Sequence, residues 1–142
     1  MTSTANGREF ENIIANNLQI KGIVFSEQPP YFPKRISITV TPDFEIKNKN
    51  NNSLFVFAQQ DFWNGGQQSD RFGHVVQMDQ FVWNPGEVFY VLRYPGVFKK
   101  EPKRWTNKQK LKDKLYKDLE ERQVVGSLEQ LMERLNGFMS EN

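Results

Sequence analysis

The chain has 142 residues, of which 37% are hydrophobic and 25% are charged, and these values fit one globular domain with an ordinary core. It contains no cysteine and one histidine, which excludes disulfide bonds, thiolate zinc sites, cysteine nucleophiles and histidine-based metal clusters. Any metal ion must therefore be held by oxygen atoms.

No run of residues approaches the roughly 20 apolar positions that a bilayer span needs. The polar start of the chain, residues 1–6, also lacks the apolar region of a signal peptide. We therefore expect a soluble, cytoplasmic protein that makes no membrane contact.

The first predicted element is a helix that Asn6 or Gly7 caps and Gly22 ends. Its apolar residues recur at three- and four-residue steps: Phe10, Ile13, Ile14 and Leu18. Glu11 lies between these positions. Its side chain either points inward beside the apolar stripe or lies at its edge in water, and the spacing leaves both alternatives open.

Several strands are predicted next, separated by breaker residues. Residues 23–25 read as a short strand, and the three prolines within 29–33 predict a loop. Residues 36–40 alternate with period two, and 43–47 and 54–61 form further strands around a polar turn. Three consecutive strands predict an antiparallel meander.

In the second half of the chain, the sequence predicts one helix, then one strand, and then two further helices. Residues 67–82 favour a helix, and the continuous apolar run at 88–92 favours a buried central strand. Thr106 caps a charged helix, and Ser127 opens a final helix with the Ser-x-x-Gln form of a capping box. We expect a core domain at residues 1–98. A basic helical hairpin at 99–142 then packs on the same domain or serves oligomerisation.

Positive charge is concentrated before and within the first of these two helices. Residues 99–122 carry ten basic and five acidic residues, a local excess of five positive charges in a chain whose net charge is +2. This excess indicates contact with a phosphate backbone, although a solvated helix face would have the same composition.

Acidic and amide groups follow two neighbouring predicted strands. Pro42 and Asp43 begin one apolar strand, and Gln59, Gln60 and Asp61 end the next. Carboxylate and amide oxygens are hard ligands that suit Mg²⁺ better than Zn²⁺. The pattern predicts a magnesium site that acts on phosphate esters.

These segments, together with residues 7–11, resemble the core motifs of the PD-(D/E)XK nuclease superfamily, and in particular its compact restriction-type homing endonucleases. The resemblance implies an α/β fold with a restriction endonuclease-like core, of element order αβββαβ around a mixed sheet. It also implies a Mg²⁺-dependent endonuclease that cuts double-stranded DNA at specific sites, with Mn²⁺ able to substitute, in the cytoplasm of a bacterial or phage-infected cell.

The resemblance assigns roles residue by residue. Asp43 matches the metal-binding aspartate of the superfamily, and Glu11 matches its helix glutamate. Gln59 stands where the superfamily usually has an acidic ligand, and Asp61 stands where it usually has a lysine. Gln59 still offers a carbonyl oxygen and Asp61 adds a negative charge for the metal ion. The missing lysine cation would be replaced by Lys47, by Arg71 or by a second metal ion; Lys47 shares the face of Asp43 if the strand runs straight.

DNA recognition is expected from loops around residues 28–35, 47–52 and 67–71 and from the basic segment. The residues concerned are Arg35, Lys49, Gln67, Gln68, Arg71, Lys99, Lys100, Lys103 and Arg104. Because so small a chain does not cover both strands of a long duplex, cleavage of both strands implies a homodimer or homotetramer.

Three other functions remain open from the sequence. A structure-selective junction or repair nuclease would use the same site with little sequence preference. A catalytically silent DNA-binding module would explain the missing lysine. An α/β protein-interaction domain would need no nucleic acid at all.

Overall fold

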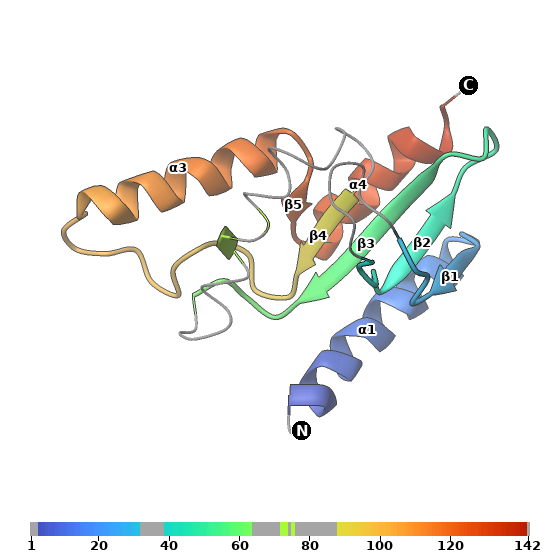
Figure 1. Ribbon diagram of the computed structural model, residues 1–142, viewed down its shortest axis with the longest axis horizontal. Helices are drawn as coiled ribbons and strands as arrows, with labels where there is room; N and C mark the ends of the chain where they lie inside the picture. Colours follow the sequence, from blue (N-terminus) through green and yellow to red (C-terminus); the bar gives the residue numbers. More distant parts are fainter. Residues whose placement is uncertain (1–2, 32–38, 64–71, 74, 76–87, 142) are drawn as a thin grey trace.

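The computed structural model describes residues 3–31, 39–63, 72–73, 75 and 88–141. Within these residues the fold is α/β, with a five-stranded mixed sheet and three helices (Figure 1). None of the described helices has the length and apolarity that crossing a membrane requires.

The sheet has the strand order β1-β2-β3-β4-β5. Its strands are β1 (Phe25–Glu27), β2 (Phe44–Lys47), β3 (Ser53–Gln59), β4 (Val88–Leu92) and β5 (Val125–Gly126). The first three strands are antiparallel neighbours, whereas β3 pairs with β4 in parallel and β4 pairs with β5 in parallel. Three consecutive antiparallel strands are therefore present, but the first of them is β1, whereas the sequence predicted residues 36–40 in that place.

The first helix, α1 (Ser3–Ile20), begins a few residues earlier than the sequence predicts. It ends where predicted, since Gly22 adopts a φ of 71°, a left-handed conformation that glycine tolerates best. The amide of Ile23 then bonds back to the carbonyl of Leu18 at 2.9 Å. Because Ile23 is used to close the helix, β1 begins at Phe25 and not at residue 23.

The other helices are α3 (Asn107–Glu121) and α4 (Leu128–Met139). Thr106 and Ser127 cap them, and each forms the full reciprocal capping box with the glutamine three residues later. Both predicted helix starts are confirmed. In Figure 1, α3 runs outward from the β5 edge of the sheet, with its N-terminal end farthest from the strands.

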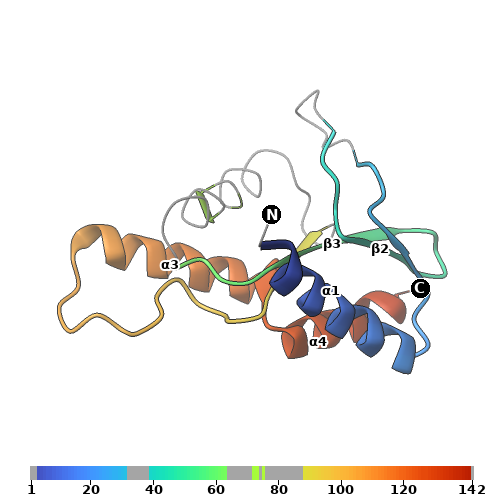
Figure 2. The same cartoon turned by 90° about the horizontal axis from the view of Figure 1, so that it is seen from below.

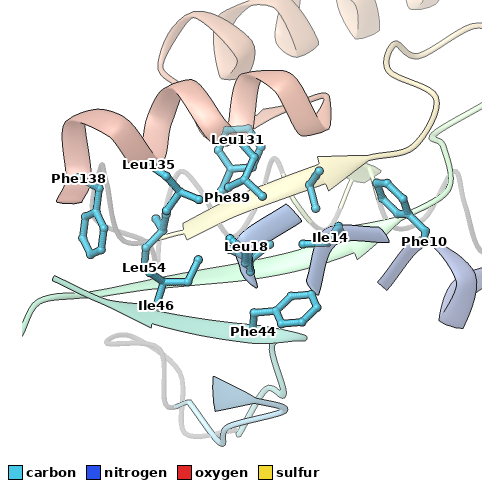
Figure 3. Packing of buried hydrophobic residues seen from close by; sticks show 12 residues of the cluster. Phe10, Ile14, Leu18, Phe44, Ile46, Leu54, Phe89, Leu131, Leu135 and Phe138 are labelled. Atoms are coloured by element: carbon cyan, nitrogen blue, oxygen red, sulfur yellow. The ribbon is translucent and has the colours of Figure 1, made fainter. Parts of the chain in front are cut away.

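The two faces of the sheet bury different clusters. We call one the α1-side cluster, because Phe10, Ile14 and Leu18 of α1 meet apolar residues of α4 and of the strands there (Figure 3). Figure 2 shows α1 and α4 beneath the same face. The other, the α3-side cluster, packs Tyr116 and Leu119 of α3 against Phe62, Phe72, Val75 and the opposite face of β4.

The last two helices therefore do not form the predicted hairpin. They pack in different clusters, on different faces of the sheet, and β5 lies between them in the chain. The two residues of β5 join the sheet beside β4. The segment after residue 99 therefore extends the sheet by one strand and packs a helix on each of its two faces.

Two predicted elements fall largely outside the described residues. Of the strand predicted at 36–40, Val40 forms an isolated antiparallel bridge with Tyr31, and residues 36–38 are not described. Of the helix predicted at 67–82, Phe72, Gly73 and Val75 are described and are helical.

Candidate functional site

One end of the sheet gathers residues from several strands, and we call it the Asp43 end. The pairing register sets Glu27, the last residue of β1, opposite Phe44, the first residue of β2. Phe44 in turn lies opposite Val56, near the end of β3. The parallel strand β4 ends beside β3, where Leu92 is paired with Gln59. The topology thus brings together groups that are far apart in the sequence.

Asp43 itself is fixed between two strands. Its amide donates to the carbonyl of Val56 at 2.9 Å, and its carbonyl accepts from the amide of Gln28 at 3.0 Å. Its carboxylate oxygen Oδ2 accepts from the amide of Ala58 at 2.6 Å. The side chain is therefore held at the entrance to β2 in a defined orientation.

Glu11 lies near Asp43, as the resemblance implies. Both side chains line a cavity of about 200 Å³, together with Arg8, Asn12, Glu27, Gln28 and Phe44. We call this cavity the acidic hollow. Glu11 is half-buried beside Phe10, a core residue of α1, so of the two alternatives for Glu11 the structure favours a position at the edge of the apolar stripe, directed into the hollow.

The other two residues of the expected site do not line the hollow. The Oε1 atom of Gln59 is buried, and within the described part of the chain it has no hydrogen-bond partner. Asp61 is only 4% exposed, and its Oδ1 atom accepts from the amide of Trp63 at 3.3 Å. Asp61 thus shapes the turn that follows β3.

Lys47 lies at the opposite end of β2 from Asp43. It is paired with Ser53 at the start of β3, whereas Asp43 precedes the strand. Four residues of extended chain separate the two positions, which is about 13 Å. This distance keeps the ammonium group of Lys47 away from the Asp43 carboxylate.

The acidic hollow has no preformed set of three metal ligands among the described residues. Among the residues that the structure describes, no group of three His, Cys, Asp or Glu side chains is arranged to hold a metal ion. Glu11 and Asp43 nevertheless offer two carboxylates to one cavity. A Mg²⁺ ion commonly takes one or two carboxylates and completes its octahedron with water and phosphate oxygens, so these two residues fit such an ion.

Of the nine residues expected to contact DNA, five are described. Lys99, Lys100, Lys103 and Arg104 are exposed between β4 and α3, and Lys49 is exposed in the turn between β2 and β3. Arg35, Gln67, Gln68 and Arg71 lie outside the described residues. The rings of Phe98 and Trp105, which flank residues 99–104, meet edge to face with their centres 5.6 Å apart. This contact holds the two ends of the exposed basic stretch together.

Lys112 differs from the other lysines of α3. Its Nζ atom donates to the carbonyl of Phe62 at 3.2 Å and lies 5.4 Å from the ring centre of Phe72. Burial lowers the pKa of this amine. Lys112 therefore serves the packing of α3 on the sheet, and it does not belong to the exposed basic surface.

Of the residues that line the hollow, the sequence assigned no site role to Arg8, Asn12, Glu27 and Phe44, and it placed Gln28 only in a DNA-recognition loop. Arg8 was visible as part of the motif at residues 7–11, but nothing in its spacing marked a role. Glu27 ends a strand that begins two residues later than predicted, and Gln28 follows it; both reach the hollow through the pairing of β1 with β2.

Comparisons with known proteins add no assignment: no protein-family model, no curated protein and no solved structure matches this chain.

Proposed function

We propose that this chain is a Mg²⁺-dependent DNA endonuclease that hydrolyses phosphodiester bonds at specific sites, of the restriction or homing type. The observation that carries the proposal is the shared hollow of Glu11 and Asp43. These residues are 32 positions apart in the sequence, and the resemblance implies that both are metal ligands.

The arrangement of elements supports the same proposal. A helix precedes three antiparallel strands, helical residues at Phe72–Gly73 follow, and β4 returns parallel to β3. This order is compatible with the αβββαβ order that the resemblance implies. Compatibility of order is weaker support than the hollow, because many α/β proteins share a mixed sheet with helices on both faces.

In the proposed reaction, Glu11 and Asp43 hold the metal ion and thereby place it at one end of the sheet. The bound ion would polarise the phosphate and lower the pKa of a coordinated water. The water oxygen bonds to phosphorus, one P–O ester bond breaks, the water proton passes to solvent, and the departing oxygen takes up a proton. The backbone of β3 keeps the Asp43 carboxylate in position through the amide of Ala58.

DNA binding is assigned to the exposed basic segment, in which Lys99, Lys100, Lys103 and Arg104 contact phosphates. A homodimer or homotetramer would place two such sites on the two strands. Sequence recognition is assigned to the loops around residues 28–35, 47–52 and 67–71. Lys49, in the second of these loops, is described and exposed.

A catalytically silent DNA-binding module is the second candidate, and specific observations favour it. Asp61 stands where the superfamily usually has lysine, and it is buried in a turn. In the described part of the chain no preformed group of three metal ligands exists either. Such a module would keep the fold and the basic surface without hydrolysis.

Cleavage of a genome-scale DNA mixture tests both candidates in one experiment. The protein is compared with its Asp43→Ala variant and with an EDTA control, in Mg²⁺ and in Mn²⁺. Discrete fragments that disappear in both controls are the expected result. Intact DNA under every condition, with duplex binding preserved, would show that the silent module is the correct candidate.

A further inference from the structure

The acidic hollow contains a positive charge that the resemblance does not assign. Arg8 lines it beside Glu11 and Asp43. Arg8 and Glu11 are three residues apart on α1, so their side chains lie on the same face of the helix. Arg8 therefore brings a positive charge to the cavity in which the proposed metal ion and phosphate would bind.

Of the two cations considered earlier, only Lys47 is among the described residues. Lys47 lies at the far end of β2, and Arg71 is outside the described residues. Arg93, which follows β4 at the Asp43 end, is engaged by other groups: it pairs with Glu9 at 3.3 Å and lies 5.7 Å from the ring centre of Tyr94. No ion pair of Arg8 is found within the described part of the chain.

The charges of the hollow suit a metal ion and a phosphodiester together. Three carboxylates (Glu11, Glu27 and Asp43) and one guanidinium line it, which gives a formal charge of −2. One divalent cation balances this charge. The guanidinium then offers the substrate a planar set of donors, which matches two oxygens of one phosphate.

We propose that Arg8 binds the non-bridging oxygens of the phosphodiester in the acidic hollow and so takes the electrostatic role of the missing lysine. Arg8 makes a charge-assisted hydrogen bond and transfers no proton. This inference rests on the proposed function for its reaction, but the contact between Arg8 and a phosphodiester is measurable without cleavage.

The contact is tested by the Nε–Hε resonances of the seven arginines in a ¹⁵N-labelled full-length protein. Spectra are recorded with Ca²⁺ while a short DNA duplex is added, and Arg8→Lys identifies the Arg8 resonance. A shift of this resonance that saturates with duplex is expected. Arg8→Gln should weaken duplex binding roughly 10-fold, and Arg8→Lys should restore part of the loss.

The matched control is Arg134→Gln, which removes an arginine of α4 outside the basic stretch, where its guanidinium lies 5.8 Å from the ring centre of Phe138. Its affinity should equal that of the wild type. An unmoved Arg8 resonance at saturating duplex, or wild-type binding by Arg8→Gln, would overturn the inference. Circular dichroism of Arg8→Gln confirms that the fold is retained, as expected for an exposed helix residue.

Cleavage assays separate this inference from the proposed function. If the wild type cleaves and Arg8→Gln cleaves at the same single-turnover rate, the inference is wrong while the nuclease proposal stands. If the wild type does not cleave and the Arg8 resonance still shifts, the nuclease proposal is wrong while the phosphodiester contact stands.

Discussion

The carboxylate of Asp43 accepts a hydrogen bond of 2.6 Å from the amide of Ala58, so the side chain that precedes β2 is fixed to the backbone of β3. The stability of the fold therefore depends on a hydrogen-bond acceptor in the side chain at position 43, but it does not depend on the negative charge of that side chain. The acceptor and the charge are separable, because asparagine has the same shape as aspartate and keeps a carbonyl oxygen.

The first prediction concerns this separation. Asp43→Asn should keep most of the stability, whereas Asp43→Ala should lose about 1–2 kcal/mol, since the amide of Ala58 is left without its acceptor. Mg²⁺ at 100 times its dissociation constant should stabilise the wild type by about 2.7 kcal/mol and neither variant. Thermal unfolding with and without Mg²⁺ measures all three, and equal stabilisation of Asp43→Asn would contradict the metal assignment.

The second prediction concerns Asn48, which is 6% exposed and joins the turn after β2 to the end of α4. Its Nδ2 atom donates to the carbonyl of Phe138 at 3.0 Å, and its Oδ1 atom accepts from the amides of Asn50 and Asn52 at 3.0 and 3.1 Å. Asn48→Ala removes one buried and two part-buried hydrogen bonds and should cost about 2–4 kcal/mol in urea unfolding.

Asn50→Ala is the matched control for this variant. It removes an exposed hydrogen bond of 3.2 Å from the Asn50 side chain to the carbonyl of Glu141, and it should cost less than about 1 kcal/mol. Similar small losses in both variants would mean that the turn does not anchor the C-terminal helix. Figure 1 shows the two segments side by side.

The third prediction concerns alkaline stability. Burial in the α3-side cluster raises the pKa of the Tyr116 phenol to about 12. Since the folded pKa exceeds the unfolded value of about 10, the stability contributed by the neutral phenol is fully present below pH 10. It is lost as the pH rises toward 12.

Tyr116→Phe should flatten this alkaline loss in urea unfolding measured from pH 8 to 11. Tyr94→Phe, which removes the hydroxyl of a tyrosine that is 49% exposed, should leave the curve of the wild type unchanged. An alkaline loss of equal size in the wild type and in Tyr116→Phe would show that another group causes it.

The fourth prediction concerns the basic segment. If Lys99 and Lys100 each contact one phosphate, the double change to alanine should reduce the slope of log affinity against log salt by about 2. Lys21→Ala, which removes an exposed lysine just after α1, should leave the slope unaltered. Duplex binding measured by fluorescence anisotropy over a range of salt concentrations provides the slope, and an unchanged slope in the double variant would remove these lysines from the interface.

Much of the fold was predictable because its signals are local. The apolar steps of α1, the continuous run of β4 and the capping boxes of Thr106 and Ser127 each involve residues within a few positions of one another. The two residues of β5 are too few to show any period. The packing of α3 and α4 on different faces depends on that strand, so it was not predictable either.

The candidate site was predictable only in part, for a related reason. Motif order placed Glu11 and Asp43 as candidates, and the tertiary fold brings them to one hollow. Strand alternation did not give the distance of Lys47 from Asp43, and no local pattern marks the burial of Asp61. Arg8 and Glu27 reach the hollow through the position of α1 and the register of β1, which are properties of the folded chain.

The most direct measurement is the mapping of a bound Mn²⁺ ion by paramagnetic broadening of backbone amide signals in the ¹⁵N-labelled protein. We predict that sub-stoichiometric Mn²⁺ broadens the amide signals of Glu11, Gln28, Asp43 and Ala58 first, and that Asp43→Asn abolishes this effect. Broadening confined to other parts of the chain, or unchanged broadening in Asp43→Asn, would contradict a metal site in the acidic hollow.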